Sequence, residues 1–81
     1  MAGTAGSSLT AELNRLASTT GKAAQGAANV YAGTSGLGLI AALNKKANAN
    51  RQPSAYKGLN AICNELASTT GKSASDALRT I

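Results

Sequence analysis

The stretch "LNRLASTTGK", residues 13–22, decides the fold, because most of it returns as "CNELASTTGK" at residues 63–72. The run "LASTTGK" is identical in the two copies. A related segment, "ANVYAGTSGL", lies between them at residues 28–37. Recurrence of one segment at a regular spacing is the signature of a repeat architecture.

An asparagine marks the same position of each repeat. Asn14, Asn29 and Asn44 are 15 residues apart, Asn64 follows after 20, and Arg79 stands a further 15 residues along. Apolar residues recur five residues before this anchor, one before it and two after it, and those offsets form one stripe of an α-helix. The pattern therefore predicts five short helices, at residues 8–17, 22–32, 37–48, 54–67 and 73–81.

The segments between the helices share a turn chemistry. "STTGK" occurs at residues 18–22 and 68–72, and "GTSGL" at residues 33–37. We expect glycine to end each helix in the left-handed conformation and Ser or Thr to cap the next helix. In the third unit "NANRQPSAY", residues 48–56, replaces the turn and adds five residues. There Ser54 is a predicted cap after Pro53, and Ser73 with Asp76 has the spacing of a capping box.

The chain is short of bulky apolar side chains. Its 81 residues include 13 Leu, Ile and Val residues and no Phe or Trp. Burying a Leu contributes roughly 1.5–3 kcal/mol, whereas ordering each residue costs about 1.5 kcal/mol. We therefore expect an all-α domain over residues 8–81, a small bundle or open array stabilised by association with other chains, preceded by a flexible segment at residues 1–7.

The sequence offers little to a catalytic or metal site. There is no His, one cysteine, and three scattered carboxylates, at Glu12, Glu65 and Asp76. A metal cluster or an activated nucleophile needs groups of these types close together. Cys63 occupies an apolar stripe position, which predicts a small core residue. We expect no catalytic residue, no cofactor, no metal and no small-molecule substrate.

The segment "GKS", residues 71–73, resembles the end of a phosphate-binding loop. Such a loop needs a glycine where Leu66 stands, and it follows a β-strand rather than a helix. The segment is therefore interpreted as a joint between helices.

The net charge of +5 is dispersed along the chain, apart from the pair Lys45-Lys46. No stretch of about 18 apolar residues is present, so no membrane span is expected. The most basic and least repetitive segment surrounds the third joint. It is the candidate partner contact, with a solvated loop as the alternative; its residues are Lys45, Lys46, Arg51, Tyr56 and Lys57.

The anchor asparagines also need an explanation, because asparagine is a poor residue inside a helix. One interpretation is that they form structural hydrogen bonds to a neighbouring helix or an adjacent turn. The other is that they face the solvent. These two alternative interpretations concern the same four residues, Asn14, Asn29, Asn44 and Asn64.

The units "ELNRLASTTGK", "AANVYAGTSGL", "AALNKKAN" and "ICNELASTTGK" resemble small Ala/Gly-rich proteins of tailed bacteriophages, particularly those of actinobacterial hosts. In those proteins units similar to "LNxLAGTTGL" recur. The resemblance covers about residues 9–81, and the third unit departs from it. It implies a capsid-associated or tail-associated component, located in the virion after synthesis in the host cytoplasm, and it offers no catalytic residues.

These observations lead to three functional expectations. The first is a non-enzymatic virion structural protein, a capsid decoration or minor capsid protein that binds the major capsid protein, copies of itself, or both. The second is a minor tail or tail-fibre attachment protein. The third is a small basic nucleic-acid-binding protein, against which stand the dispersed charge and the near absence of aromatic residues for base stacking.

Overall fold

The computed structural model describes residues 8–81, and this part of the chain is helical, without strands. It contains α1 (Leu9–Ala17), α2 (Ala24–Ala32), α3 (Leu39–Ala47), α4 (Leu59–Ala67) and α5 (Ala74–Arg79), with a 3-10 turn, η1 (Pro53–Ala55), between α3 and α4. The predicted all-α fold of five short helices is confirmed. The segment at residues 1–7, expected to be flexible, lies outside the described residues.

The helices keep the register of the repeat. Each of α1 to α4 begins five residues before its anchor asparagine and ends three residues after it. The prediction of a helix over residues 54–67 is wrong at its start, because η1 is a separate turn and α4 begins only at Leu59. Ser54 therefore lies within η1, and Gly58 is the residue before the first turn of α4.

The residues that end the helices differ from the predicted glycines. Ser18 ends α1 and Ser68 ends α4, both in the left-handed region with φ of 58°, and only α2 ends at a glycine, Gly33. A non-glycine residue in this region costs on the order of 1 kcal/mol. The cost is offset by backbone bonds that close each helix end, such as that from the N–H of Thr19 to the carbonyl of Asn14 (2.9 Å).

Side-chain capping is limited to two helices. The Ser8 hydroxyl accepts a bond from the N–H of Ala11, and the Ser73 hydroxyl accepts one from Asp76 (3.4 Å), as the capping-box spacing predicted. The helices α2, α3 and α4 begin without a side-chain cap. The expectation that the turn hydroxyls cap the next helix is therefore wrong for these three helices.

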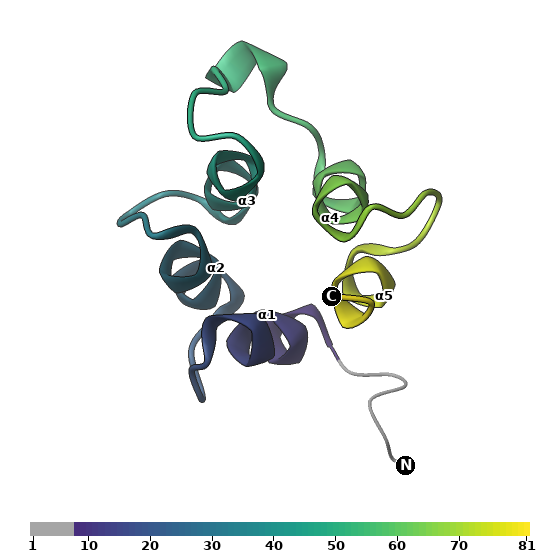
Figure 1. Cartoon of the computed structure of the whole chain (residues 1–81). Coiled ribbons are helices and arrows are strands. Elements are labelled where there is room, and N and C mark those ends of the chain that lie inside the picture. Colours follow the sequence, from purple (N-terminus) through teal and green to yellow (C-terminus); the bar gives the residue numbers. More distant parts are fainter. Residues whose placement is uncertain (1–7) are drawn as a thin grey trace.

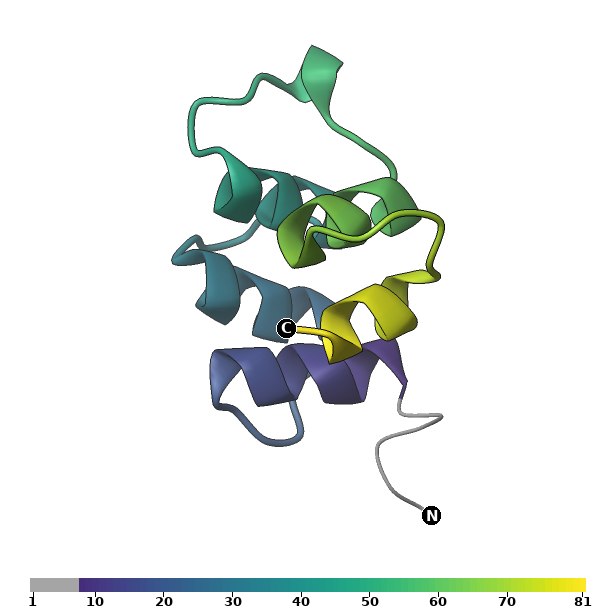
Figure 2. The ribbon, with the colours of Figure 1, turned by 45° about the vertical axis from the view of Figure 1, so that its right-hand side comes forward.

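The helices form a closed ring (Figures 1 and 2). Each packs against the next along the chain, and α5 packs against α1. Of the two predicted arrangements the structure is thus a bundle rather than an open array. The described residues, 8–81, measure 39 × 27 × 14 Å, and the shortest dimension is about the length of one nine-residue helix.

The core consists mostly of the two residues before each anchor. The residue directly before it was predicted to be buried, and it is fully buried in all five units, at Leu13, Ala28, Leu43, Cys63 and Leu78. The residue two before it is also buried, which the sequence reasoning missed, because this position holds a carboxylate in the first unit and alanine in three others. The outer stripe positions lie against this core, except at Lys46 and Ile81, which are exposed.

We expect the Cys63 thiol to be protected from reaction in the folded chain. Burial raises the pKa of Cys63 to about 11, which lowers the thiolate fraction near pH 8 by roughly a hundredfold. Reaction with a colorimetric disulfide reagent should be slower by at least that factor in buffer than in urea. An exposed thiol made by Ala61→Cys in a Cys63→Ala chain should react quickly in both. Equally fast reaction of Cys63 in buffer would show that the thiol is not buried.

Candidate functional site

Each anchor asparagine lies buried between its own helix and the turn that follows. The Nδ2 of Asn14 donates to the carbonyls of Thr10 and Lys22, both at 2.9 Å. Its Oδ1 accepts from the hydroxyl of Thr19 (2.8 Å) and the N–H of Lys22 (3.1 Å). Two donors and two acceptor sites are the full capacity of a side-chain amide. We call this set of four hydrogen bonds the asparagine bridge.

The asparagine bridge recurs with the same geometry in α2 and α4. Asn29 bonds the carbonyl of Gln25, the hydroxyl of Thr34 and both backbone groups of Leu37, at 2.8–3.2 Å. The amide of Asn64 makes the equivalent bonds to the carbonyl of Asn60, the hydroxyl of Thr69 and both backbone groups of Lys72. Because the residue eight places after each anchor is held beside it, the turn runs back along the helix that it has just left.

The third joint keeps the asparagine bridge despite its five extra residues. Asn44 is fully buried and bonds the carbonyl of Ile40 and both backbone groups of Lys57, which is 13 residues further on. The hydroxyl partner is absent, and the guanidinium of Arg51 donates in its place (3.1 Å). The insertion is thus looped out between two fixed points, and it projects from the ring beyond α3 and α4 (Figures 1 and 2).

Arg51 is held from the other side by α4. It makes two hydrogen bonds to the Glu65 carboxylate, at 3.2 and 2.9 Å, and Lys57 Nζ lies 3.0 Å from the same carboxylate. Only 14% of the Arg51 side chain is exposed. Hydrogen bonds from Arg51, and then from Lys57, hold the pKa of Glu65 below its ordinary value. The carboxylate therefore fixes the base of the loop to α4.

The structure brings together four of the five predicted contact residues. Lys45 Nζ donates to the carbonyls of Ala49 (3.3 Å) and Arg51 (2.9 Å) and lies 6.0 Å from the centre of the Tyr56 ring. Together with the bonds of Arg51 and Lys57 described above, these contacts hold the loop against α3 and α4. Lys46 lies apart from them, 4.6 Å from the centre of the Tyr31 ring of α2.

The ring is closed by charges that the sequence reasoning did not find. Glu12, only 2% exposed, lies 2.9 Å from Arg15 and 3.7 Å from Arg79 of α5. Arg15 also donates to the carbonyl of Leu78 (2.8 Å). Two features of the sequence could have revealed this contact. One is a carboxylate at an otherwise apolar position of α1, and the other is an arginine at the anchor position of the fifth unit.

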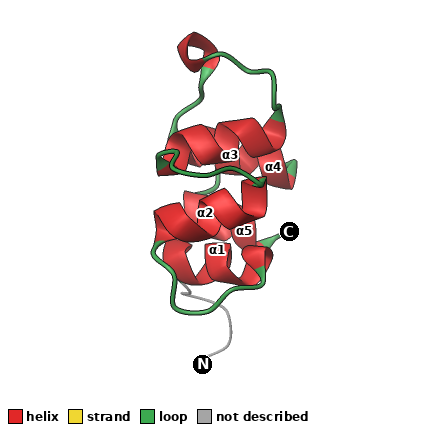
Figure 3. Ribbon diagram, turned by 90° about the vertical axis from the view of Figure 1, so that its left-hand side faces the viewer, coloured by secondary structure: helices red, strands yellow, loops and turns green. Residues whose placement is uncertain are grey.

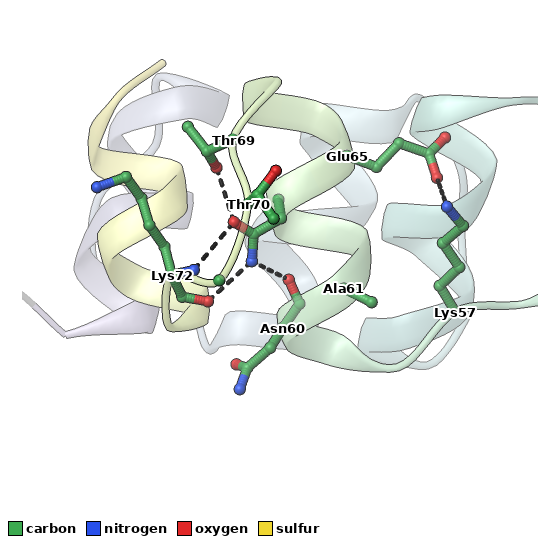
Figure 4. A pocket seen from close by; sticks show the side chains of 9 residues that line it. Lys57, Asn60, Ala61, Glu65, Thr69, Thr70 and Lys72 are labelled. Carbon is green, nitrogen blue, oxygen red and sulfur yellow. Dashed lines mark hydrogen bonds and ion pairs between the residues drawn. The ribbon is translucent and has the colours of Figure 1, made fainter.

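An open depression of about 540 Å³ lies between α4 and its turn (Figure 4), lined by Lys57, Asn60, Ala61, Asn64, Glu65, Thr69, Thr70, Gly71 and Lys72. Its polar groups are largely engaged in the structure. Glu65 is paired, and the N–H of Lys72 is bonded to Asn64. The following serine caps α5. The segment at residues 71–73 is therefore a joint between helices, as the sequence reading proposed.

Across residues 8–81, no group of three or more Cys, Asp or Glu side chains is placed so that it could hold a metal ion. Within the same residues, no helix has the length and apolar character needed to cross a membrane. A comparison of the chain with protein families, curated proteins and solved structures finds no match.

Removal of one asparagine bridge should lower the stability of the fold. Asn64→Ala leaves buried backbone groups of the turn without partners, and we expect the free energy of unfolding in urea to fall by about 3 kcal/mol. Thr69→Val removes one of the four bonds and should cost about 1 kcal/mol. Asn50→Ala, in the exposed loop, is the control and should change the value by less than about 0.5 kcal/mol. An Asn64→Ala chain as stable as this control would contradict the role of the bridge.

The Glu65 cluster predicts a pH dependence. Because its pKa is lowered in the folded chain from an ordinary value of 4.5, the stabilisation is complete above that value and is lost as the pH falls through the lowered pKa. The Tm difference between the natural chain and Glu65→Gln, followed by circular dichroism, should therefore be largest near neutral pH and shrink below about pH 4. Asp76 is present in both chains, so its contribution to the Tm difference cancels. A difference that stays constant from neutral to acid pH would exclude this contribution.

Proposed function

We propose that the chain is a non-enzymatic structural protein of a bacteriophage virion that binds the capsid shell as a decoration or minor capsid protein. The observation that carries this proposal is the asparagine bridge. The Asn, Thr and Gly residues that recur in the resembling phage units are the ones that build the joint between helix and turn. The repeat is therefore a structural module.

The ionisable groups of residues 8–81 support a non-enzymatic role. Glu12, Glu65 and Asp76 each lie in an ion pair with arginine. The Cys63 thiol is fully buried, and burial raises its pKa to about 11. A general base or nucleophile must reach a substrate in its reactive protonation state. The buried Cys63 and Glu12 cannot reach a substrate, and Glu65 and Asp76 are each engaged by arginine.

The mechanism that we propose is adhesion. The ring is 14 Å in its shortest dimension, and its core is built largely from alanine and a few larger aliphatic side chains. Contacts with shell subunits or sister copies would add burial that the isolated ring lacks, and many identical weak contacts reinforce one another on a particle. At micromolar concentration the isolated chain should accordingly be oligomeric.

The other two functional expectations have less support. A tail or tail-fibre attachment protein would use the same helices, and only its location differs. A nucleic-acid-binding protein would need free cations and aromatic faces. Here four of the eight cations lie in ion pairs, at Arg15, Arg51, Lys57 and Arg79, and the ring of Tyr31 is covered by Lys46.

We expect antibody labelling of purified virions to place the chain on the shell in many copies. Virions produced with its gene deleted should assemble and then break at a lower temperature, because the reinforcing contacts are missing. Adding the purified chain back is the control and should restore the breakage temperature. Labelling confined to the tail would support the second function. Absence from virions, combined with steeply salt-dependent binding to DNA, would overturn the proposal in favour of the third.

A further inference from the structure

The repeat provides its own comparison for the surface, because each position can be compared between units. Three positions that are polar or charged in the other units hold large apolar residues around the turn between α2 and α3. Val30 stands where other units have Arg15, Lys45, Glu65 and Thr80. Leu37 stands where they have Lys22, Lys57 and Lys72, and Ile40 where they have Thr10, Gln25, Asn60 and Ser75.

The repeat predicts that these three apolar residues share one surface. The residues at the same positions of the fourth unit line a single depression, which includes Lys57, Asn60, Glu65 and Lys72. The asparagine bridge gives the helix and the start of the turn the same backbone in each unit. By this equivalence Val30 and Leu37 lie at the edges of the corresponding surface of α2. Leu37 and Ile40 lie at the edges of the corresponding surface of α3. Leu37 therefore lies between the other two. We call this surface the α2–α3 face; Figure 3 views the molecule from the side on which this turn lies.

The fold itself does not require apolar side chains on the α2–α3 face. Val30 is 47% exposed and Ile40 is 41% exposed, and Leu37 is only partly buried against the core. The asparagine bridge of Asn29 uses only the backbone of Leu37. Other units fill these positions with Lys or Asn and keep the same joint. Exposed apolar side chains that the fold does not need are typical of an interaction surface.

The segment that forms the α2–α3 face carries positive charge only. No Asp or Glu occurs between Leu13 and Asn64. The Lys22 stem lies across α2 close to Gly26, where an added Cβ would be 3.8 Å from the Lys22 Cβ. On α3, Lys45 donates only to carbonyls and Lys46 lies over an aromatic ring. Within residues 8–81 these three lysines are not part of any ion pair with a carboxylate.

We propose that the α2–α3 face docks an acidic protein surface, in which apolar side chains are flanked by carboxylates. This inference rests on the proposed function, and it names the docking surface and the chemistry of the partner. An apolar centre with a charged rim is the common anatomy of a protein interface, and complementary charge speeds and orients docking. The same face of a second copy does not match, since pairing the face with itself would oppose lysines to lysines.

The test uses substitutions that the repeat already contains. Leu37→Lys and Ile40→Asn introduce the residues that the fourth unit has at those positions, so the ring should be retained, which urea unfolding checks. Ile81→Asn is the matched control, because Ile81 is similarly exposed (45%) and lies outside the α2–α3 face. Lys22→Glu tests the charge, and Lys72→Glu, at the same position of the last turn, is its control.

Binding is measured by cosedimentation of each purified chain with virions produced without it. We expect the Leu37→Lys/Ile40→Asn chain and the Lys22→Glu chain to bind at least about tenfold more weakly than the natural chain. The two control chains should bind within about twofold of it. Ile40→Asn alone provides a milder variant if the double substitution weakens folding, and it should still reduce binding by several-fold.

The outcomes separate this inference from the proposed function. If the natural chain binds and the substituted chains bind equally well, the docking surface is wrong and the function stands. If the natural chain does not bind the particles, both are overturned. If the substitutions on the α2–α3 face instead abolish self-association of the free chain in sedimentation, with particle binding unchanged, the occupant is a second copy and the acidic partner is excluded.

Discussion

The structure depends on one buried amide per unit. Helices of nine residues are marginal by themselves, and the core between them is made largely of alanine and a few larger aliphatic side chains. The asparagine bridge compensates by fixing the returning turn against the helix through four hydrogen bonds. Because these bonds are buried, exchanging them for bonds to water would first require the joint to open. The bridge thereby holds each turn against the helix that precedes it.

The two departures from the repeat follow a common rule. Where the turn hydroxyl is missing, Arg51 reaches Asn44 and is neutralised by Glu65. Where the fifth anchor is not an asparagine, Arg79 lies beside the buried Glu12 of the first helix. In both places a long cation replaces a short polar group, and a carboxylate from a different helix accompanies it. Each departure therefore links parts of the chain that the repeat alone leaves separate.

Local features of this molecule could be predicted from its sequence, and long-range ones could not. The spacing of the asparagines gave the number of helices, their positions and the fully buried residue before each anchor. The same spacing was uninformative about α5 packing on α1, because ring closure depends on the angle between units, which no single unit encodes. The contact prediction named Arg51 and Lys57 but did not reveal that both are bonded to Glu65. Fourteen residues separate Arg51 from that partner, and no periodicity links them.

The looped-out third joint has a practical consequence. Its two ends are pinned to α3 and α4 by Asn44 and Glu65, while Gln52 to Ala55 at its outer part are exposed. A foreign peptide spliced between these ends would replace η1 and should leave α1 to α5 in place. If the ring is carried in many copies on a particle, that position becomes a grafting point for displaying epitopes in a dense regular lattice, as vaccine scaffolds require.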